Sequence, residues 1–239
     1  MPRFFKTDFE NAPFIEGDDA AHIAKSLRMR VGEELTVCNA SGTDFNCKIS
    51  NISQSRVDFE IISACPTSSE PTVKVTLFQC LPKSDKMDSV VKQSVELGVT
   101  EIVPVISSRC VSIPDQKAAV KKVERWQKIA NEAAGQSGRG ILPKVCEIIS
   151  FKQLLGKISE FDKVLMFYEN GGVSVASTNA KSGSCAIIIG SEGGFSQDEV
   201  DAAREKGATV CTLGKRILRT ETAPLTALAA IMTLSGNMD

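Results

Sequence analysis

Glycine-rich or charged loops follow three apolar stretches in the second half of the sequence. The segments are MFYENGG (166–172), IIIGSEGGF (187–195) and LGKRILRTETA (213–223). In open α/β sheets, ligands bind beyond the carboxyl ends of the strands, and glycine lets a ligand approach bare backbone. Three such loops therefore predict a ligand pocket that is built where strands end.

The charge and glycine spacing of these loops narrow the class of ligand. The chain has no G-x-x-x-x-G-K-S/T run, and GSEGG does not match the G-x-G-x-x-G fingerprint of dinucleotide sites. Glu192 would also repel a pyrophosphate. S-adenosylmethionine suits the loop better, because it carries a sulfonium and an amino group next to adenosine. The alternative is that GSEGG is simply a tight turn leading into a capped helix.

Cations concentrate in the last loop, next to the start of a helix. Lys215, Arg216 and Arg219 precede or flank Glu221 and Thr222, which open an apolar helix. Arginine side chains and helix N-termini both favour anions such as phosphate, although a solvated basic loop is the alternative. Other basic residues that could contact phosphates, but that singly are typical of surface charge, are Lys25, Arg28, Arg30, Lys83, Lys86 and Arg139.

The composition argues against several other classes of protein. With a net charge of −1, no global basic field draws the chain to nucleic acid. No apolar run reaches the ~20 residues of a membrane span, and the N-terminus lacks the apolar centre of a signal peptide, so we expect a cytoplasmic protein without membrane contact. His22 is the only histidine, and the eight cysteines form no C-x-x-C pair. We therefore expect buried free thiols, no metal site and no Ser-His-Asp catalysis.

The pattern of apolar residues divides the chain into two parts. Residues 1–70 alternate apolar and polar side chains in short runs, which predicts a small β-barrel or sandwich. After the linker-like CPTSSEPT (65–72), apolar runs alternate with helical patterns through residues 71–239. Ser150 with Gln153, and Ser196 with Glu199, have the spacing of capping boxes. This order predicts a mostly parallel sheet with helices on both faces, and general topology rules favour an unknotted one.

Several of these blocks together resemble a known family. The sequence is similar to the bacterial ribosomal RNA small subunit methyltransferase E family, of the SPOUT class, over nearly the whole chain. Where family members often have proline after the first glycine of the GSEGG loop, this chain has Ser191, and position 215 is Lys; neither change removes a backbone contact. The blocks that carry the resemblance are HIAKSLRMRVGEEL, LPKSDKMDSVVKQSVELGVTEIVPVISSRC, ERWQKIANEAAGQSGR, IIIGSEGGFSQDEV and LGKRILRTETAPLTAL.

The resemblance implies a fold, a reaction and partners. It implies a PUA-like RNA-binding β-barrel over 1–70 and a knotted SPOUT domain over 71–239, with a trefoil knot at the C-terminus. It also implies a homodimer that methylates N3 of one uridine in 16S ribosomal RNA of the small subunit, using S-adenosylmethionine. The cofactor residues that it implies are Met166, Phe167, Glu169, Ile189, Gly190, Glu192, Gly193, Gly194, Leu213, Gly214, Ile217, Leu218, Arg219, Thr222 and Ala223.

Methylation at N3 requires that the uracil lose its N3 proton. A base must accept that proton, or a cation must stabilise the uracil anion, while N3 lines up with the methyl carbon. Glu192 and Glu221 are candidate bases, and Arg219 and Arg139 are candidate stabilisers of negative charge. The sequence leaves the choice of base open. It also leaves open a related enzyme acting on another RNA, a nucleotide-dependent enzyme of another class, and a non-catalytic RNA-binding relative.

Overall fold

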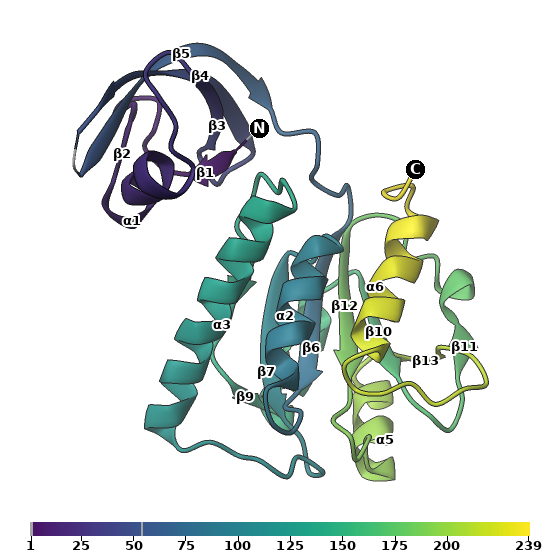
Figure 1. Ribbon diagram of the computed structural model, residues 1–239. Coiled ribbons are helices and arrows are strands. Elements are labelled where there is room, and N and C mark those ends of the chain that lie inside the picture. The colour runs from purple at the N-terminus through teal and green to yellow at the C-terminus, as the bar shows by residue number, and fades with distance from the viewer. Residues whose placement is uncertain (1, 54) are drawn as a thin grey trace. The chain divides into compact units, whose positions relative to one another are not determined.

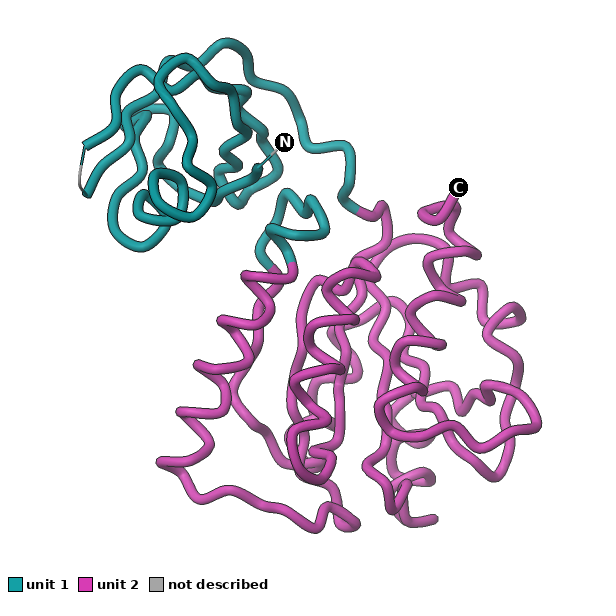
Figure 2. The backbone as a smooth tube through the Cα atoms, in the orientation of Figure 1, with its two compact units in different colours: residues 1–70, 134–142 teal, residues 71–133, 143–239 magenta. Residues whose placement is uncertain are grey.

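The computed structural model describes residues 2–53 and 55–239, which form two compact units. Unit 1 comprises residues 1–70 and 134–142, and unit 2 comprises residues 71–133 and 143–239. Figure 2 shows the two units in different colours. Each unit has its own sheet. The fold of each unit can therefore be explained from its own residues.

Unit 1 is built on a curled five-stranded sheet (Figure 1). The strands lie in the order β1-β3-β4-β5-β2, with β1 parallel to β3 and the other pairs antiparallel. This sheet confirms the β-rich N-terminal part that the alternating pattern predicts. The strands are β1 (Arg3–Phe5), β2 (Phe14–Glu16), β3 (Glu34–Cys38), β4 (Thr43–Ile52) and β5 (Arg56–Pro66).

One apolar core holds the sheet of unit 1 together. Phe9, Leu35 and Ile49 are almost completely buried in it. A short helix, α1 (Gly17–Ala21), and the π-helical turn η1 (His22–Ser26) close this core, with Ile23 fully buried. Lys25, Arg28 and Arg30 remain exposed around this turn.

A distant stretch of the chain completes unit 1 through a buried ion pair. Glu70 accepts hydrogen bonds at 2.9 Å from both Nε and Nη2 of Arg139. It also accepts from the backbone N–H groups of Gly140 (2.7 Å) and Ile141 (3.1 Å). The Arg139 side chain is only 3% exposed, so this charge has left water and depends on Glu70.

Unit 2 contains an all-parallel sheet, as the alternation of apolar runs and helical patterns predicts. Its strands lie in the order β11-β13-β10-β12-β6-β7-β8, and β9 also pairs with β7. The central strands are nearly continuous apolar runs that are buried on both faces, which is typical of parallel sheets. The strands are β6 (Lys74–Cys80), β7 (Glu101–Ile106), β8 (Lys144–Val145), β9 (Ile149–Ser150), β10 (Lys163–Phe167), β11 (Val173–Ser174), β12 (Ser184–Ile189) and β13 (Thr209–Thr212).

Helices cover both faces of this sheet. Right-handed crossovers that run in opposite directions from the centre of a parallel sheet place their helices on opposite faces. The β6-α2-β7 and β12-α5-β13 connections run in opposite directions, so α2 and α5 lie on different faces. Accordingly, α2 packs with α6, which Figure 1 shows in front of the sheet, whereas α5 packs with α4. The helices are α2 (Lys86–Glu96), α3 (Gln116–Gln136), α4 (Phe151–Lys157), α5 (Gln197–Glu205) and α6 (Ala223–Leu234), with 3-10 turns η2 (Ile158–Glu160) and η3 (Val175–Thr178).

Local signals in the sequence set where two of these helices begin. Ser150 and Ser196 are the N-caps of α4 and α5. In each case the serine accepts from the backbone N–H three residues later, and Gln153 or Glu199 reaches back to the cap. Both predicted capping boxes are therefore confirmed. Because they satisfy free N–H groups, they fix the direction in which the chain leaves β9 and the GSEGG loop.

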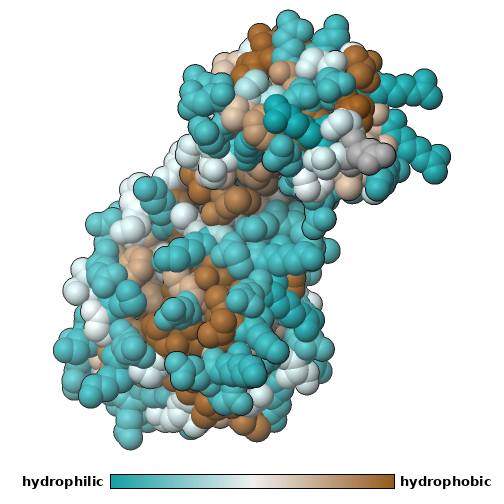
Figure 3. All heavy atoms as spheres, turned by 90° about the vertical axis from the view of Figure 1, so that its left-hand side faces the viewer, coloured by the Kyte–Doolittle hydropathy of each residue, from teal (hydrophilic) through white to brown (hydrophobic). Residues whose placement is uncertain are grey.

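The long helix α3 turns one face inward and exposes the other. Trp126 and Ala130 are buried, and the Trp126 Nε1–H donates to Asp88 of α2 at 3.1 Å. Trp126 therefore packs α3 against α2. The outer face exposes Lys121, Lys128 and the apolar Val120. Figure 3 shows this side of the molecule, where hydrophilic and hydrophobic residues lie next to one another.

The segment after β13 crosses the ends of neighbouring strands before it enters α6. The strand β13 lies between β11 and β10, yet Thr220 contacts the ends of β12 and β6. Its hydroxyl donates to the Gly190 carbonyl at 2.7 Å, and Gln79 Nε2 donates to Thr220 Oγ1 at 3.1 Å. Gln79 is fully buried and Thr220 is 5% exposed, so these contacts fix Thr220 against the sheet in the protein interior.

We predict that the Glu70→Gln substitution destabilises unit 1 and flattens its pH dependence. Burial acts to raise the pKa of Glu70, but the Arg139 guanidinium and two backbone N–H groups outweigh it and hold that pKa below its ordinary value. A lowered carboxyl pKa contributes stability that is present above the unfolded pKa of about 4.3 and is lost as the pH falls through the folded value. At pH 7 the substitution should cost about 3 kcal/mol, because it removes the carboxylate charge that faces the buried Arg139 guanidinium.

Urea unfolding followed by circular dichroism checks this prediction, with the exposed Glu10→Gln as the matched control. The gap between wild type and Glu70→Gln should narrow below about pH 5. Equal stability of the two proteins at pH 7, or a gap that does not change with pH, would contradict it.

Candidate functional site

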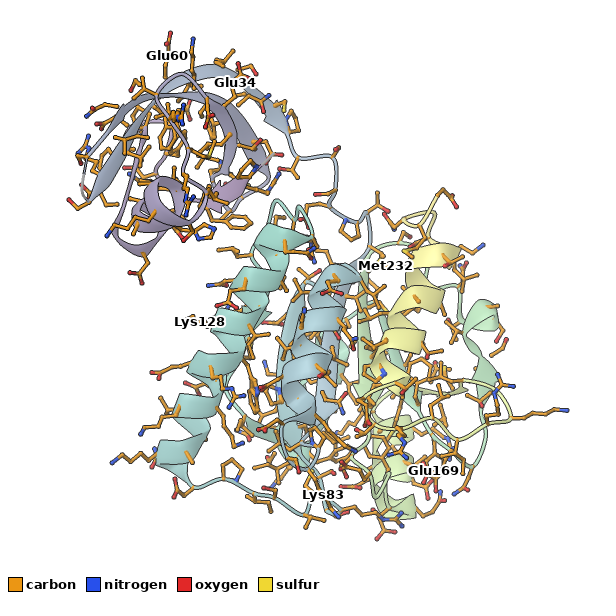
Figure 4. The ribbon with its side chains drawn as sticks, in the orientation of Figure 1. Glu34, Glu60, Lys83, Lys128, Glu169 and Met232 are labelled. Atoms are coloured by element: carbon orange, nitrogen blue, oxygen red, sulfur yellow. The ribbon has the colours of Figure 1, made fainter. Side chains whose placement is uncertain are left out.

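A cavity of about 450 Å³ lies at the carboxyl ends of β10, β12 and β13 in unit 2. The loops that follow these strands, at residues 167–169, 189–195 and 212–220, supply most of its lining. Figure 4 labels Lys83, which follows β6, and Glu169, which follows β10; both lie at this edge, whereas Met232 of α6 lies at the opposite end of unit 2. The structure thus brings the three predicted loops together, and the volume is in the range of small-molecule sites.

Most of the residues predicted to bind a cofactor line this cavity. Met166 and Thr222 do not line it; Met166 is fully buried within β10. The predicted residues that do line it are Phe167, Glu169, Ile189, Gly190, Glu192, Gly193, Gly194, Leu213, Gly214, Ile217, Leu218, Arg219 and Ala223.

The cavity also includes residues that the sequence did not predict for a cofactor site. Lys86 and Arg216 line it, although we predicted them as RNA contacts. The position of Lys86 follows from the order of the strands, because Lys86 begins the helix after β6, and β6 lies next to β12. The others adjoin predicted residues in the sequence: Tyr168, Ser191, Phe195, Thr212, Lys215 and Thr220.

The GSEGG loop is both a tight turn and a cavity wall. The Gly194 N–H donates to the Ser191 carbonyl at 2.9 Å, and Gly194 has a φ of +65°, which favours glycine. The loop leads directly into the capped α5. The alternative of a simple turn into a helix is therefore compatible with a binding loop, since one geometry serves both.

Arg109, which follows β7, supports the same loop. Its Nη1 donates to the Gly193 carbonyl at 2.8 Å, and its own carbonyl accepts from the Ser191 hydroxyl at 3.3 Å. A Cβ atom on Gly193 would lie 2.9 Å from the Arg109 Cβ and 3.2 Å from its carbonyl oxygen. Gly193 therefore allows the loop to pack directly against the segment after β7.

Glu169 is a carboxylate of the cavity wall. Its Oε1 lies 2.5 Å from where a Cβ of Gly194 would be, so glycine leaves the space that this carboxylate occupies. Among the residues that the structure describes, no hydrogen bond or ion pair is made by the Glu169 carboxylate. Glu169 is therefore free to accept hydrogen bonds from hydroxyl or ammonium groups of a ligand.

A three-residue charge cluster lies at the edge of the cavity. Lys86 Nζ lies 2.9 Å from Glu192 Oε1 and 3.2 Å from Glu221 Oε2, and the hydrogen bonds that it donates to both carboxylates raise the pKa of Lys86. Glu192 also accepts from the backbone N–H of Lys83 at 3.2 Å. Burial acts to raise the pKa of Glu192, but Lys86 and the backbone N–H groups lower it below its ordinary value. Glu192 is thus an ionised, well-paired carboxylate.

The loop after β13 places two arginines and an exposed apolar residue at the cavity. Arg216 and Arg219 are exposed, and Ile217 is 83% exposed although it lines the cavity. An exposed isoleucine flanked by cations suits a loop that covers a ligand with both apolar and anionic parts.

Arg139, which we predicted as a stabiliser of negative charge, does not line this cavity. It belongs to unit 1, where its guanidinium is buried against Glu70. This pairing also removes it from the exposed basic residues suited to phosphate contacts. Lys25, Arg28 and Arg30 of unit 1 and Lys83 of unit 2 are exposed, so their prediction as RNA contacts stands.

None of the cysteines lines the cavity. Six of the cysteines are buried free thiols, whereas Cys65 is exposed and Cys146 is intermediate. No group of three His, Cys, Asp or Glu residues in residues 2–53 and 55–239 is arranged to hold a metal ion. In the same part of the chain, no helix has the length and apolar character needed to span a membrane.

Comparisons with known proteins identify the family. A family model of the RNA methyltransferase domain matches residues 68–232, and one of the RNA methyltransferase PUA domain matches residues 15–62. The ribosomal RNA small subunit methyltransferase E of Bacillus subtilis is 38% identical, over 97% of this chain and 96% of that protein. The chain belongs to the ribosomal RNA small subunit methyltransferase E family. The Aquifex aeolicus member is 33% identical, over 86% of this chain and 87% of its own.

Solved structures of methyltransferase E proteins and their relatives have the same fold. The Neisseria gonorrhoeae methyltransferase E, bound to S-adenosyl methionine, is 37% identical with a TM-score of 0.88, over 98% of each chain. A Legionella pneumophila protein in complex with the same cofactor is 28% identical with a TM-score of 0.87, over 98% of this chain and 97% of its own. These likenesses confirm the PUA and SPOUT architecture of this methyltransferase E family member.

We predict that Gly193→Ala and Gly156→Ala change stability in opposite directions. A methyl group at 193 meets the Arg109 backbone and should cost about 1–3 kcal/mol of unfolding free energy. Gly156 lies in α4 with nothing near its Cβ position, so alanine there should add up to about 1 kcal/mol. Urea unfolding measures both changes, and a neutral or stabilising Gly193→Ala would show that the loop does not need this close approach.

Proposed function

We propose that this protein transfers a methyl group from S-adenosylmethionine to N3 of a uridine in 16S ribosomal RNA of the small subunit. The observation that supports this proposal most is the cavity at the ends of β10, β12 and β13, in a chain of the methyltransferase E family. A pocket shaped by glycine backbone and one free carboxylate suits a cationic adenosyl ligand. It suits a pyrophosphate poorly, because Glu169 and Glu192 would repel it.

The residues of the cavity can hold each part of the cofactor. Gly190 and Gly193 offer backbone to the adenosine, and Leu213 and Ile217 offer apolar contact to its base. Glu169 can accept hydrogen bonds from ribose hydroxyls or the ammonium group. When bound, S-adenosylmethionine supplies an activated methyl group on a sulfonium. The protein's own task is then to align uracil N3 with that methyl group and remove the N3 proton.

Arg219 and its neighbours on the last loop can serve the nucleobase. Uracil develops negative charge on its oxygens as N3 loses a proton, and a cation fixed nearby stabilises that charge. Arg219 lines the cavity and is exposed. No ion pair to its guanidinium is found among the described residues, so its charge remains available for the substrate.

Unit 1 and the exposed basic residues can bind the RNA backbone. The PUA match covers residues 15–62, and this range contains Lys25, Arg28 and Arg30. Together with Lys83 and Arg216, these residues can neutralise phosphates.

If the three residues of unit 1 each contact one phosphate, their combined replacement by alanine should lower the slope of log affinity against log salt by about two. An unchanged slope in a filter-binding titration would exclude them as phosphate contacts.

The proposal includes a homodimer, a knot and a cytoplasmic location. The helix α6, APLTALAAIMTL, has no charged residue, and its outer residues Ala229 and Ala230 are partly exposed, which favours a second copy as partner. Light scattering should then give twice the chain mass.

The crossing of residues 213–222 supports a C-terminal knot, which chain tracing in an experimental density map tests. Cell fractionation tests the location, which the ribosomal substrate favours.

We predict that the protein labels uridine N3 of unmodified small subunits and that Arg219→Ala suppresses this labelling. Methyl-labelled S-adenosylmethionine supplies the label, and reverse transcription maps it, because an N3 methyl blocks base pairing. Loss of a charge-stabilising group should slow turnover by about 100-fold or more, with little change in melting temperature.

The exposed Lys206→Ala removes a cation away from the cavity and serves as the control, with turnover expected at the wild-type level. Label on a ribose or a uracil carbon would contradict N3 as the target. Label on another RNA would favour a related substrate, and binding without any label would favour a non-catalytic RNA-binding protein.

A further inference from the structure

Three carboxylates near the cavity compete for the role of proton acceptor. They come from different elements: Glu169 follows β10, Glu192 follows β12, and Glu221 lies two residues before α6. A general base must offer a lone pair within hydrogen-bond reach of the proton that it accepts. The hydrogen bonds that each carboxylate already makes therefore help to distinguish them.

Glu192 is already engaged in several contacts. Both of its oxygens lie 3.2 Å from the Lys83 backbone nitrogen, and Oε1 also accepts from Lys86 at 2.9 Å. These contacts tie the GSEGG loop to the segment after β6. They also lower the pKa of Glu192, which makes it a weaker proton acceptor. Glu192 is better suited to hold Lys86 in place than to take a proton.

Glu169 differs from the other two in its surroundings. Its carboxylate packs against the Cα of Gly194, and it makes no contact with Lys86. It lines the cavity that we assign to the cofactor. We therefore expect Glu169 to accept hydrogen bonds from the hydroxyl or ammonium groups of the cofactor and not to contact the nucleobase.

Glu221 combines a fixed position with free lone pairs. Its one ion pair among the described residues is with Lys86 Nζ, 3.2 Å from Oε2, and this oxygen is itself buried, so a substrate can reach only Oε1. The neighbouring residues Arg219, Thr220 and Ala223 line the cavity, and the Glu221 side chain is 28% exposed. Glu221 does not itself line the cavity, but its neighbours and its ion pair with Lys86 place it at the cavity edge.

The net charge of the cluster formed by Lys86, Glu192 and Glu221 favours the uptake of a proton. Lys86 carries one positive charge and is shared between two carboxylates, so the three residues together keep one net negative charge. Because Glu192 also attracts Lys86, this ammonium does not neutralise Glu221 completely.

We propose that Glu221 is the general base of the reaction, with Lys86 and Glu192 as positioning residues. The N3 proton moves to a carboxylate oxygen of Glu221. The N3 electron pair forms the new bond to the methyl carbon, and the bond between this carbon and sulfur breaks with its electrons remaining on sulfur. This assignment rests on the proposed function, and it gives Lys86 a role in the cluster in place of the predicted phosphate contact.

The decisive experiment compares the turnover of Glu221→Gln with that of wild type on unmodified small subunits between about pH 6.5 and about pH 9.5. This range runs from about neutral pH to the pH at which uridine itself ionises. Without the base, only solvent removes the N3 proton, so turnover near neutral pH should fall by about 100-fold. The deficit should shrink as the pH rises. It should also shrink on subunits that contain 5-fluorouracil, because fluorine withdraws electrons and makes N3 more acidic.

Two variants and one binding measurement separate this role from a structural one. Glu221→Asp keeps a carboxylate and should retain more activity than Glu221→Gln, with the wild-type pH dependence. Glu205→Gln, an exposed residue of α5, should behave as wild type. Calorimetry without RNA should give S-adenosylmethionine dissociation constants within about twofold for Glu221→Gln and wild type, because the base acts on the nucleobase.

The outcomes distinguish this proposal from the proposed function. If wild type methylates N3 but Glu221→Gln loses little activity, or loses the same factor at every pH and on 5-fluorouracil subunits, Glu221 is not the base. If Glu221→Gln does not fold, the turnover of Glu221→Asp is compared with that of Glu192→Gln, which changes a positioning residue. A folded Glu221→Asp variant with no more turnover than Glu192→Gln also overturns the assignment. If wild type places no methyl on N3, the proposed function itself fails.

Discussion

The buried hydrogen bonds among Thr220, Gln79 and the Gly190 carbonyl are the constraint on which the site depends. They join three segments: the end of β6, the first residue of the GSEGG loop, and the segment that leads into α6. A buried polar group without a partner costs about 1–3 kcal/mol, so each member keeps the others in place. Without this junction, the loop after β13 would have no fixed position beside the loop after β12.

The same junction explains how the charged residues of the cavity come together. Once Thr220 is fixed, the next residue, Glu221, lies close enough for an ion pair with Lys86 of α2. Once Gly190 is fixed, Glu192 reaches both Lys86 and the Lys83 N–H. A neutral, buried contact thus positions a half-buried ionic cluster. This order is energetically reasonable, because ion pairs near the surface contribute little stability on their own.

Local features of the sequence predicted much of the fold and the cavity, whereas contacts between distant residues did not follow from it. Apolar runs gave the strands, and Ser196 with Glu199 gave the start of α5. The glycine loops indicated most of the lining. The Glu70–Arg139 pair spans 69 residues and the Lys83–Glu192 contact spans 109, and neither leaves a local pattern. The position of β13 between β10 and β11 was equally hidden, because a parallel strand carries no signal for its neighbours.

The most direct test of this account is calorimetric binding of S-adenosylmethionine to Thr220→Val. Valine has a similar shape but cannot hydrogen-bond to the Gly190 carbonyl, so the loops should lose their alignment. We predict that the dissociation constant rises by about tenfold or more, as expected for the loss of about 1.4 kcal/mol. The control is Thr226→Val, which removes a hydroxyl that only donates to the Thr222 carbonyl at 3.0 Å. A folded Thr220→Val protein with wild-type affinity would contradict the claim that this junction builds the site.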